Sequence, residues 1–92
     1  MYEVIPSKQF RKDVKLAQSR GYNMQLLTEV IKIMAEGKTL PEKYRDHALI
    51  ASRKYKGVKE CHIQPDWLLI YKIDNNKLML YLSRTGSHSD LF

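Results

Sequence analysis

Residues 58–82, with the sequence VKECHIQPDWLLIYKIDNNKLMLYL, decide the fold class. They contain three short runs rich in branched and aromatic residues, separated by QPD and DNN, which are typical turn sequences. A similar run, HALIAS, occupies residues 47–52 and is joined to them by a further turn sequence, RKYKG. The second half of the chain is therefore predicted to form a four-strand antiparallel meander.

The first half of the chain has a helical period instead. The segment YEVIP at residues 2–6 alternates like a short strand, and Ser7 after it is suited to cap a helix. The apolar residues of this first helix recur at helical spacing: Phe10, Val14 and Ala17. A second helix is predicted between a cap at Asn23 and Gly37. Its apolar stripe is broad: Leu26, Leu27, Val30, Ile31, Ile33 and Met34. The two helices are predicted to form an antiparallel hairpin.

The order of strand, two helices and four strands defines an α+β class, with both helices on one face of the sheet. The 92 residues are enough for one compact domain with a modest core and too few for two. Residues 1–92 are therefore predicted to form a single domain.

Composition narrows the classes of function. The formal charge is +6, from 16 Lys and Arg against 10 Asp and Glu, which favours a polyanionic partner. The single cysteine, Cys61, has no disulfide partner and matches no zinc-binding spacing, so we expect no metal or other cofactor and a reducing compartment. No apolar run approaches the ~20 residues of a membrane span, and the N-terminus lacks a signal-peptide pattern. We expect a soluble cytoplasmic protein without a membrane partner.

Strand pairing is predicted to gather polar side chains at one edge of the sheet. A last hairpin that turns about residues 75–76 sets Trp67 opposite Arg84. Pairing of HALIAS with VKECHI sets His47 beside Ile63. The C-terminal tail starts from the same edge, so all three histidines of the chain converge. The side chains expected at this edge are His47, His62, Asp66, Trp67, Arg84, His88 and Phe92.

These residue types suit the cleavage of RNA by its own 2′-hydroxyl. That reaction needs a base for the hydroxyl proton, an acid for the departing 5′-oxygen and a cation for the phosphate. Histidine serves as base or acid, because an unperturbed pKa of about 6.5 makes both protonation states available near neutrality. We take His88 as the general acid and His62 or Asp66 as the base. Arg84 suits the phosphate, and aromatic side chains stack on splayed bases. The scheme requires no metal.

Some of these residues also have a structural interpretation. Asp66 follows a proline and is a typical turn residue. Trp67 is equally suited to the core under the helices, and Arg84 to an ion pair with a carboxylate such as Asp90. The basic residues of the first helix lie opposite its apolar arc, so they form either a solvated face or a contact with ribosomal RNA.

The segments YRDHAL, ECHIQPDWLLIY and RTGSHSDLF resemble the YafQ branch of the RelE/ParE superfamily of bacterial toxin–antitoxin systems. The resemblance covers nearly the whole second half in order, and the predicted layout agrees with a RelE-like fold. It departs from the family pattern at Ala51 and Lys59, where Gly and Arg are common.

The resemblance implies a toxin that enters the A site of the 70S ribosome, cleaves mRNA there and is held inactive by a cognate antitoxin. It implies two sets of site residues. The catalytic set is His47, His62, Asp66 and His88, and the supporting set is Trp67, Arg84 and Phe92.

Two other functions remain alternatives. A non-catalytic inhibitor of the ParE branch, which binds DNA gyrase, would share the scaffold, but it has no need for three imidazoles beside an Asp and an Arg. A generic basic RNA-binding domain is the weaker alternative, because the sequence lacks the aromatic-rich sheet motifs of such modules.

The strand sequences WLLIY and LMLYL are apolar on both faces, whereas the two helices cover only one. We expect an antitoxin segment to cover part of the other face. The alternative is that the loop at residues 37–46 and the C-terminal tail cover it internally.

Overall fold

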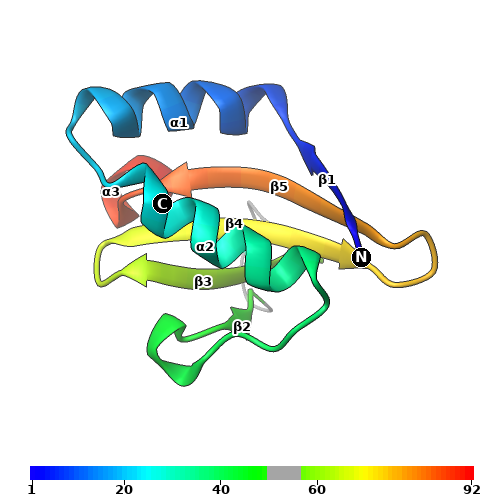
Figure 1. The fold of residues 1–92 in the computed structure, drawn as a ribbon. Coiled ribbons are helices and arrows are strands. Elements are labelled where there is room, and N and C mark those ends of the chain that lie inside the picture. Colours follow the sequence, from blue (N-terminus) through cyan, green and yellow to red (C-terminus); the bar gives the residue numbers. More distant parts are fainter. Residues whose placement is uncertain (50–56) are drawn as a thin grey trace.

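The computed structural model describes residues 1–49 and 57–92 and has the predicted α+β class (Figure 1). The elements in chain order are β1 (Glu3–Pro6), α1 (Lys8–Ser19), α2 (Met24–Ala35), the 3-10 helix η1 (Glu42–Tyr44), β2 (His47–Ala48), β3 (Lys59–Gln64), β4 (Trp67–Asp74), β5 (Met79–Gly86) and α3 (His88–Leu91). The rest of the strand predicted at 47–52, beyond residue 49, and most of the turn predicted at 53–57 lie outside the described residues.

The strands form one sheet in the order β1-β5-β4-β3-β2. From β2 to β5 each neighbouring pair is antiparallel, so the predicted meander is confirmed. The N-terminal strand β1 joins the sheet beside β5 and runs parallel to it. Strand β5 therefore has a neighbouring strand on each side along residues 79–82. Its C-terminal part, residues 83–86, continues beyond β1.

The two long helices lie on the same face of the sheet, as predicted (Figure 1). Both predicted caps form: the side chain of Ser7 accepts a hydrogen bond from the backbone N–H of Phe10, and that of Asn23 accepts one from Gln25. The core under the helices includes Phe10, Leu27, Val30 and Met34 from the helices and Cys61, Ile63, Trp67, Leu69, Tyr71, Leu80 and Leu82 from the strands.

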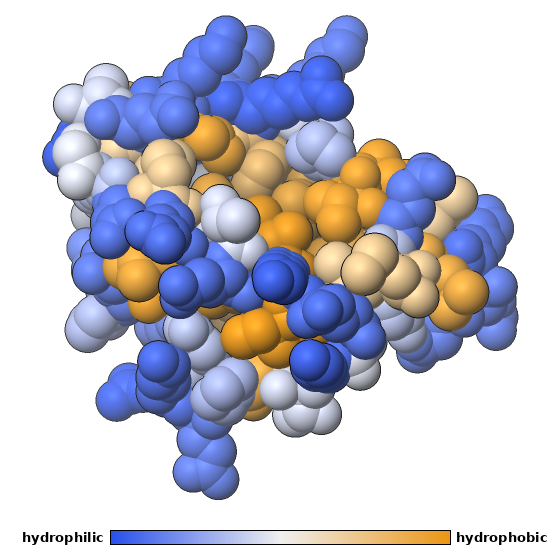
Figure 2. Space-filling model, in the orientation of Figure 1, coloured by the Kyte–Doolittle hydropathy of each residue, from blue (hydrophilic) through white to orange (hydrophobic). Residues whose placement is uncertain are grey.

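The surface of the helix layer is mixed in polarity. Figure 2, in the same orientation as Figure 1, shows hydrophobic residues reaching the surface across the middle of this face, with hydrophilic ones above and below. None of the helices within residues 1–49 and 57–92 has the length and apolarity to cross a membrane.

The C-terminal tail covers part of the opposite face of the sheet. Leu68 and Ile70 of β4 are fully buried there against Leu91 of α3. For Leu68 and Ile70 the internal alternative is right, and an antitoxin segment over the rest of this face stays a prediction. No helix is predicted in this tail, but Ser87 and Asp90 form a capping box that starts a short helix.

The last hairpin differs from the prediction in its turn and in its register. Its turn spans residues 75–78, because the carboxylate of Asp74 accepts hydrogen bonds from the next backbone N–H groups and holds a longer loop. A bulge follows Ile70 in the same strand pair. Arg84 consequently lies opposite Ile70, so its predicted place opposite Trp67 is wrong.

The register of β2 also differs from the prediction. His47 lies opposite Glu60 instead of beside Ile63. Glu60 and Ile63 are an odd number of positions apart, so the observed partner of His47 lies on the opposite face of β3 from the predicted one. His47 therefore shares a face with Glu60 and His62 and points away from the core under the helices.

Burial is expected to make the thiol of Cys61 unreactive in the folded protein. Its side chain is fully buried, and desolvation, helped by the carboxylates of Asp46 and Glu60, raises the pKa of the thiol from 9.0 to about 12. Because the thiolate is the reactive form, we expect iodoacetamide at about pH 8 to leave the folded protein unlabelled and to modify it fully in urea. Mass spectrometry measures the adduct. Rapid labelling of the folded protein would contradict this placement of Cys61.

Candidate active site

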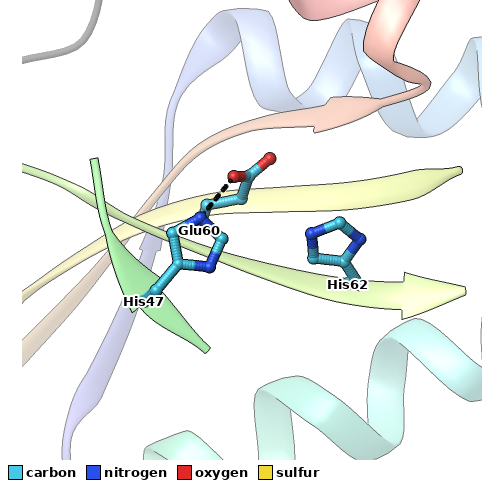
Figure 3. A group of neighbouring side chains, drawn as sticks. All are labelled: His47, Glu60 and His62. Atoms are coloured by element: carbon cyan, nitrogen blue, oxygen red, sulfur yellow. Dashed lines mark ion pairs between the residues drawn. The ribbon is translucent and has the colours of Figure 1, made fainter. Parts of the chain in front are cut away.

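Alternation along β3 directs Glu60 and His62 to the face opposite the helices, because Cys61 between them belongs to the core. His47 lies on the neighbouring strand directly opposite Glu60. The side chains of Glu60 and His62 are therefore next to each other along one strand, with His47 beside them (Figure 3).

The three histidines converge, as the sequence predicts. The ring centroids of His47 and His62 are 6.1 Å apart, and those of His62 and His88 are 5.7 Å apart. His88 reaches this position because it is the first residue of α3, directly after β5 returns to the turn between β3 and β4. The convergence survives the register differences because it depends on which ends of the strands meet.

Asp66 and His88 are joined by two hydrogen bonds to one carboxylate oxygen. Asp66 Oδ1 accepts from the backbone N–H of His88 at 2.9 Å and lies 2.6 Å from its ring Nδ1. These bonds, the backbone one first, lower the pKa of Asp66. An ionised carboxylate only accepts, so Nδ1 of His88 is the donor. Asp66 thus orients the ring of His88, which is a larger role than that of a turn residue. A carboxylate that stays ionised and is already bonded to His88 is poorly suited to act as a general base.

The short helix that carries His88 is tied to α1. Arg20 Nη1 and Nη2 lie 2.6 and 3.2 Å from the carboxylate oxygens of Asp90, which also accepts from the backbone N–H of Ser87 at 2.9 Å. The Arg20 guanidinium, followed by Ser87, holds the pKa of Asp90 well below its usual range. Gly86 has φ +156°, and a Cβ there would lie 3.0 Å from Asp90 Oδ2. The tail therefore has one defined path.

Arg84 has a carboxylate partner, as the structural alternative proposes, but the partner is Asp13 of α1 and not Asp90. Its Nε and Nη2 donate to the two oxygens of Asp13 at 2.8 and 3.1 Å. Asp13 is 7% exposed and also accepts from the backbone N–H of Thr85. This pair fixes the orientation of the guanidinium; a role in phosphate binding stays a prediction.

The two aromatic residues have opposite environments. Trp67 is 1% exposed, donates from Nε1 to Thr85 Oγ1 at 2.9 Å, and contacts the Tyr22 ring edge-on at 4.9 Å between centroids. Its ring has no exposed face for a base, so the prediction that Trp67 contacts RNA is wrong and the core interpretation is right. Phe92 is 56% exposed at the end of α3.

Glu60 is a site residue that is not among those predicted from the sequence. Its side chain is only 7% exposed, and Oε2 lies 3.0 Å from His47 Nε2 (Figure 3). The signal was present in the strand KECHI, whose alternation places Glu60 and His62 on one face. His47, Glu60 and His62 each offer a ligand atom, and these atoms all lie within 4.8 Å of one another. Spacing along the chain does not reveal this set, because it combines two strands.

Known proteins are similar to this chain in both sequence and fold. Residues 2–92 match the family model described as a bacterial toxin of type II toxin–antitoxin systems, YafQ. The mRNA interferase toxin YafQ of Escherichia coli (strain B / BL21-DE3) is 42% identical over 87 residues, which are 94% of this chain and 90% of the relative.

Solved structures agree over the whole chain. A chain of the crystal structure of the E. coli DinJ–YafQ complex has a TM-score of 0.89 and 40% identity, with coverage of 100% of this chain and 99% of that one. A metal-bound toxin from Helicobacter pylori has a TM-score of 0.90 and 40% identity, with both chains fully covered. The chain described here therefore belongs to the YafQ family of bacterial toxins of type II toxin–antitoxin systems.

Proposed function

We propose that this toxin is a ribosome-dependent endoribonuclease that cleaves mRNA in the A site, with the 2′-hydroxyl of the RNA as nucleophile. The observation that carries the proposal is the convergence of three histidines and Asp66 on the sheet face opposite the helices. The E. coli relative named an mRNA interferase supports the class of reaction. A gyrase inhibitor on the same scaffold has no need of such a cluster.

In the proposed reaction, His88 is the general acid that protonates the departing 5′-oxygen. Asp66 accepts the Nδ1–H bond of His88, so it fixes the ring and stabilises the form that carries both ring protons. Asp66 has the lowered pKa of a carboxylate that stays ionised, which leaves the base to another group. The sequence alone leaves either His62 or Asp66 as the base, and the contacts of Asp66 favour His62.

His62 is the proposed general base. Its ring lies between those of His47 and His88, at 6.1 and 5.7 Å between centroids, so base and acid flank one point where a phosphodiester can lie. His47, with Glu60 beside it, is proposed to support the base. Bond making and bond breaking balance within the RNA: the 2′-oxygen attacks phosphorus, the 5′-oxygen leaves, and a 2′,3′-cyclic phosphate remains.

Arg84 and Phe92 complete the proposed substrate site. Arg84 is the phosphate ligand, with its guanidinium held in place by Asp13. The exposed ring of Phe92 stacks on a base near the scissile bond, an interaction worth about 1–3 kcal/mol.

The macromolecular partners are proposed to be the ribosome with its mRNA and a cognate antitoxin in the bacterial cytoplasm. The solved E. coli relative is in a complex with DinJ, which supports the antitoxin. The exposed basic residues of α1 are candidates for contact with ribosomal RNA: Lys8, Arg11, Lys12 and Lys15. Such contacts strengthen binding at low salt.

Free mRNA is expected to be cleaved far more slowly than mRNA on programmed ribosomes. So small a chain offers few groups to position a substrate, and positioning supplies a large part of catalysis. Mapping of mRNA 5′ ends, with the toxin added to each substrate at equal concentration, measures both rates. Comparable rates on free and ribosome-bound mRNA would contradict the ribosome dependence. Unchanged mRNA with inhibited DNA supercoiling would instead favour the gyrase alternative.

A further inference from the structure

The short helix α3 carries His88, and the hydrogen bonds at the site are too exposed to hold its ring by themselves. The side chain of His88 is 54% exposed and that of Asp66 is 67% exposed, so water competes for the bond between them. A helix of four residues is also too short to be stable in isolation. The position of the His88 ring therefore depends on contacts elsewhere in the tail.

The end of α3 has an apolar anchor. Leu91 is fully buried against Leu68 and Ile70 of β4. The start of α3 comes directly after the bend at Gly86, whose φ of +156° is accessible to glycine at little cost. Because glycine restricts the backbone so little, the direction in which the tail leaves this bend must be set by contacts of the residues after it.

An ion pair with α1 supplies such a contact. Nη1 and Nη2 of Arg20 lie 2.6 and 3.2 Å from Oδ2 and Oδ1 of Asp90, a forked arrangement that fixes direction as well as distance. Oδ2 of Asp90 also accepts from the backbone N–H of Ser87 at 2.9 Å, so the same carboxylate closes the first turn of α3. Arg20 is the last residue of α1, which is anchored in the core by Phe10. The pair thus joins the mobile side of a glycine bend to a packed helix.

The space beside this pair leaves the tail room to move. A pocket of about 200 Å³ lies between α1 and the tail, with Arg20 and Asp90 among its lining residues and Asp13, Arg84 and Gly86 beside them. The two elements consequently meet at this place through polar side chains that reach across. Removal of either charge is expected to let the start of α3 move into that space.

We propose that Arg20 and Asp90 are positioning residues for the acid step, which hold α3 so that the ring of His88 faces that of His62. This role rests on the proposed function, in which His88 is the general acid. Nδ1 of His88 donates to Asp66, so Nε2 is the atom that delivers the proton. The ring centroids of His62 and His88 are 5.7 Å apart, a spacing that a small displacement of the tail would change. Arg20 acts through Asp90 and does not touch the RNA.

Single-turnover cleavage on programmed ribosomes, at saturating toxin, tests this role. Arg20→Ala and Asp90→Asn are each expected to lower the maximal rate about tenfold, because a misplaced acid transfers its proton poorly. The double variant is expected to be no more than about twofold slower than the slower single variant, since both remove one contact. Arg20→Lys should fall between Arg20→Ala and the wild type, because lysine keeps the charge without the fork.

A matched control accounts for the lost positive charge. Lys77 is exposed in the turn between β4 and β5, at the end of β4 opposite to Trp67. Lys77→Ala removes one positive charge far from α3 and is expected to cleave like the wild type. Circular dichroism shows that each variant is folded. Additive losses in the double variant, or an equal loss in Lys77→Ala, would mean that Arg20 acts by contact with RNA or by net charge, and would overturn the proposal.

A sulfur-substituted substrate separates positioning of the acid from a general structural role. When the scissile 5′-oxygen of the mRNA is replaced by sulfur, the leaving group needs no proton, so an acid has nothing to do. Arg20→Ala is expected to cleave this mRNA within about threefold of the wild type, although it is slow on the normal substrate. Equal slowing on both substrates would indicate impaired folding or ribosome binding and would overturn the role.

Nuclear magnetic resonance of the free protein tests the pair without reference to the reaction. The ¹⁵N order parameters of residues 88–91 are expected to be near the roughly 0.85 of rigid backbone in the wild type and clearly lower in Arg20→Ala and Asp90→Asn. Unchanged order in both variants would overturn the proposal, whatever the cleavage assay shows. Lower order with normal cleavage by Arg20→Ala and slow cleavage by His88→Gln would overturn the positioning role alone. Normal cleavage by His88→Gln would instead contradict the proposed function and leave the pair as the anchor of the tail.

Discussion

Replacing His88 by glutamine is expected to lower the single-turnover rate of mRNA cleavage on programmed ribosomes by about 10²–10⁴, the usual size of a lost general acid. Glutamine keeps a polar side chain of similar reach and can still donate to Asp66, but it cannot deliver a proton to the 5′-oxygen. The short helix α3 is held by Arg20, Asp90 and the buried Leu91, none of which is changed. Folding and ribosome binding are therefore expected to remain nearly intact.

Deletion of Phe92 is the matched comparison for His88→Gln. It removes the exposed ring that follows the same helix, together with the hydrogen bond from the Phe92 backbone N–H to the carbonyl oxygen of His88, but it leaves the imidazole of the acid unchanged. The expected cost is therefore about one stacking interaction. A His88→Gln protein that cleaves within a few-fold of the wild type would remove His88 from the mechanism. Equal losses in both variants would indicate that the tail only binds the substrate.

Replacing Trp67 by alanine is expected to destabilise the fold by about 3–5 kcal/mol, because the ring fills the core and leaves a cavity. The hydrogen bond from its Nε1 to Thr85 is lost as well. Trp67 is the single tryptophan of the chain, so the variant has no tryptophan fluorescence with which to follow unfolding. Unfolding in urea is therefore measured by circular dichroism. In this account Trp67 supports activity only through the fold.

The conservative variant Trp67→Phe distinguishes that structural role from contact with RNA. Phenylalanine keeps much of the volume and the contact with Tyr22, and it loses mainly the hydrogen bond, at a cost near 1 kcal/mol. Cleavage by the folded variant is expected to stay within a few-fold of the wild type. A Trp67→Ala protein as stable as the wild type but slow to cleave would restore the RNA-stacking interpretation.

The fold was predictable because its signals are local. Turn sequences separate the strands, and Ser7 and Asn23 cap the helices as their residue types indicate. The convergence of the histidines was also predictable, since it depends on which strand ends meet. Exact register was not, because the carboxylate of Asp74 lengthens one turn and a bulge follows Ile70.

The site residues divide in the same way. His62, Asp66 and His88 flank tight connections, so topology alone brings them together. Trp67 and Arg84 depended on register, and their partners come from helices that the strand pattern does not position. Glu60 was missed for another reason.

A lone Glu in a strand indicates a solvated side chain, and only its position opposite His47 makes it part of the site. The helix α3 was within reach of the sequence, because Ser87 and Asp90 have the spacing of a capping box.

The most direct measurement of the central claim uses mRNA whose scissile 5′-oxygen is replaced by sulfur. A thiolate leaves without being protonated, so this substrate has no need of a general acid. On programmed ribosomes, the account predicts that His88→Gln cleaves the sulfur-substituted mRNA within about tenfold of the wild type, while His62→Gln, which lacks the base, stays slow. No recovery in His88→Gln, or equal recovery in both variants, would contradict the assignment of His88 as the acid and His62 as the base.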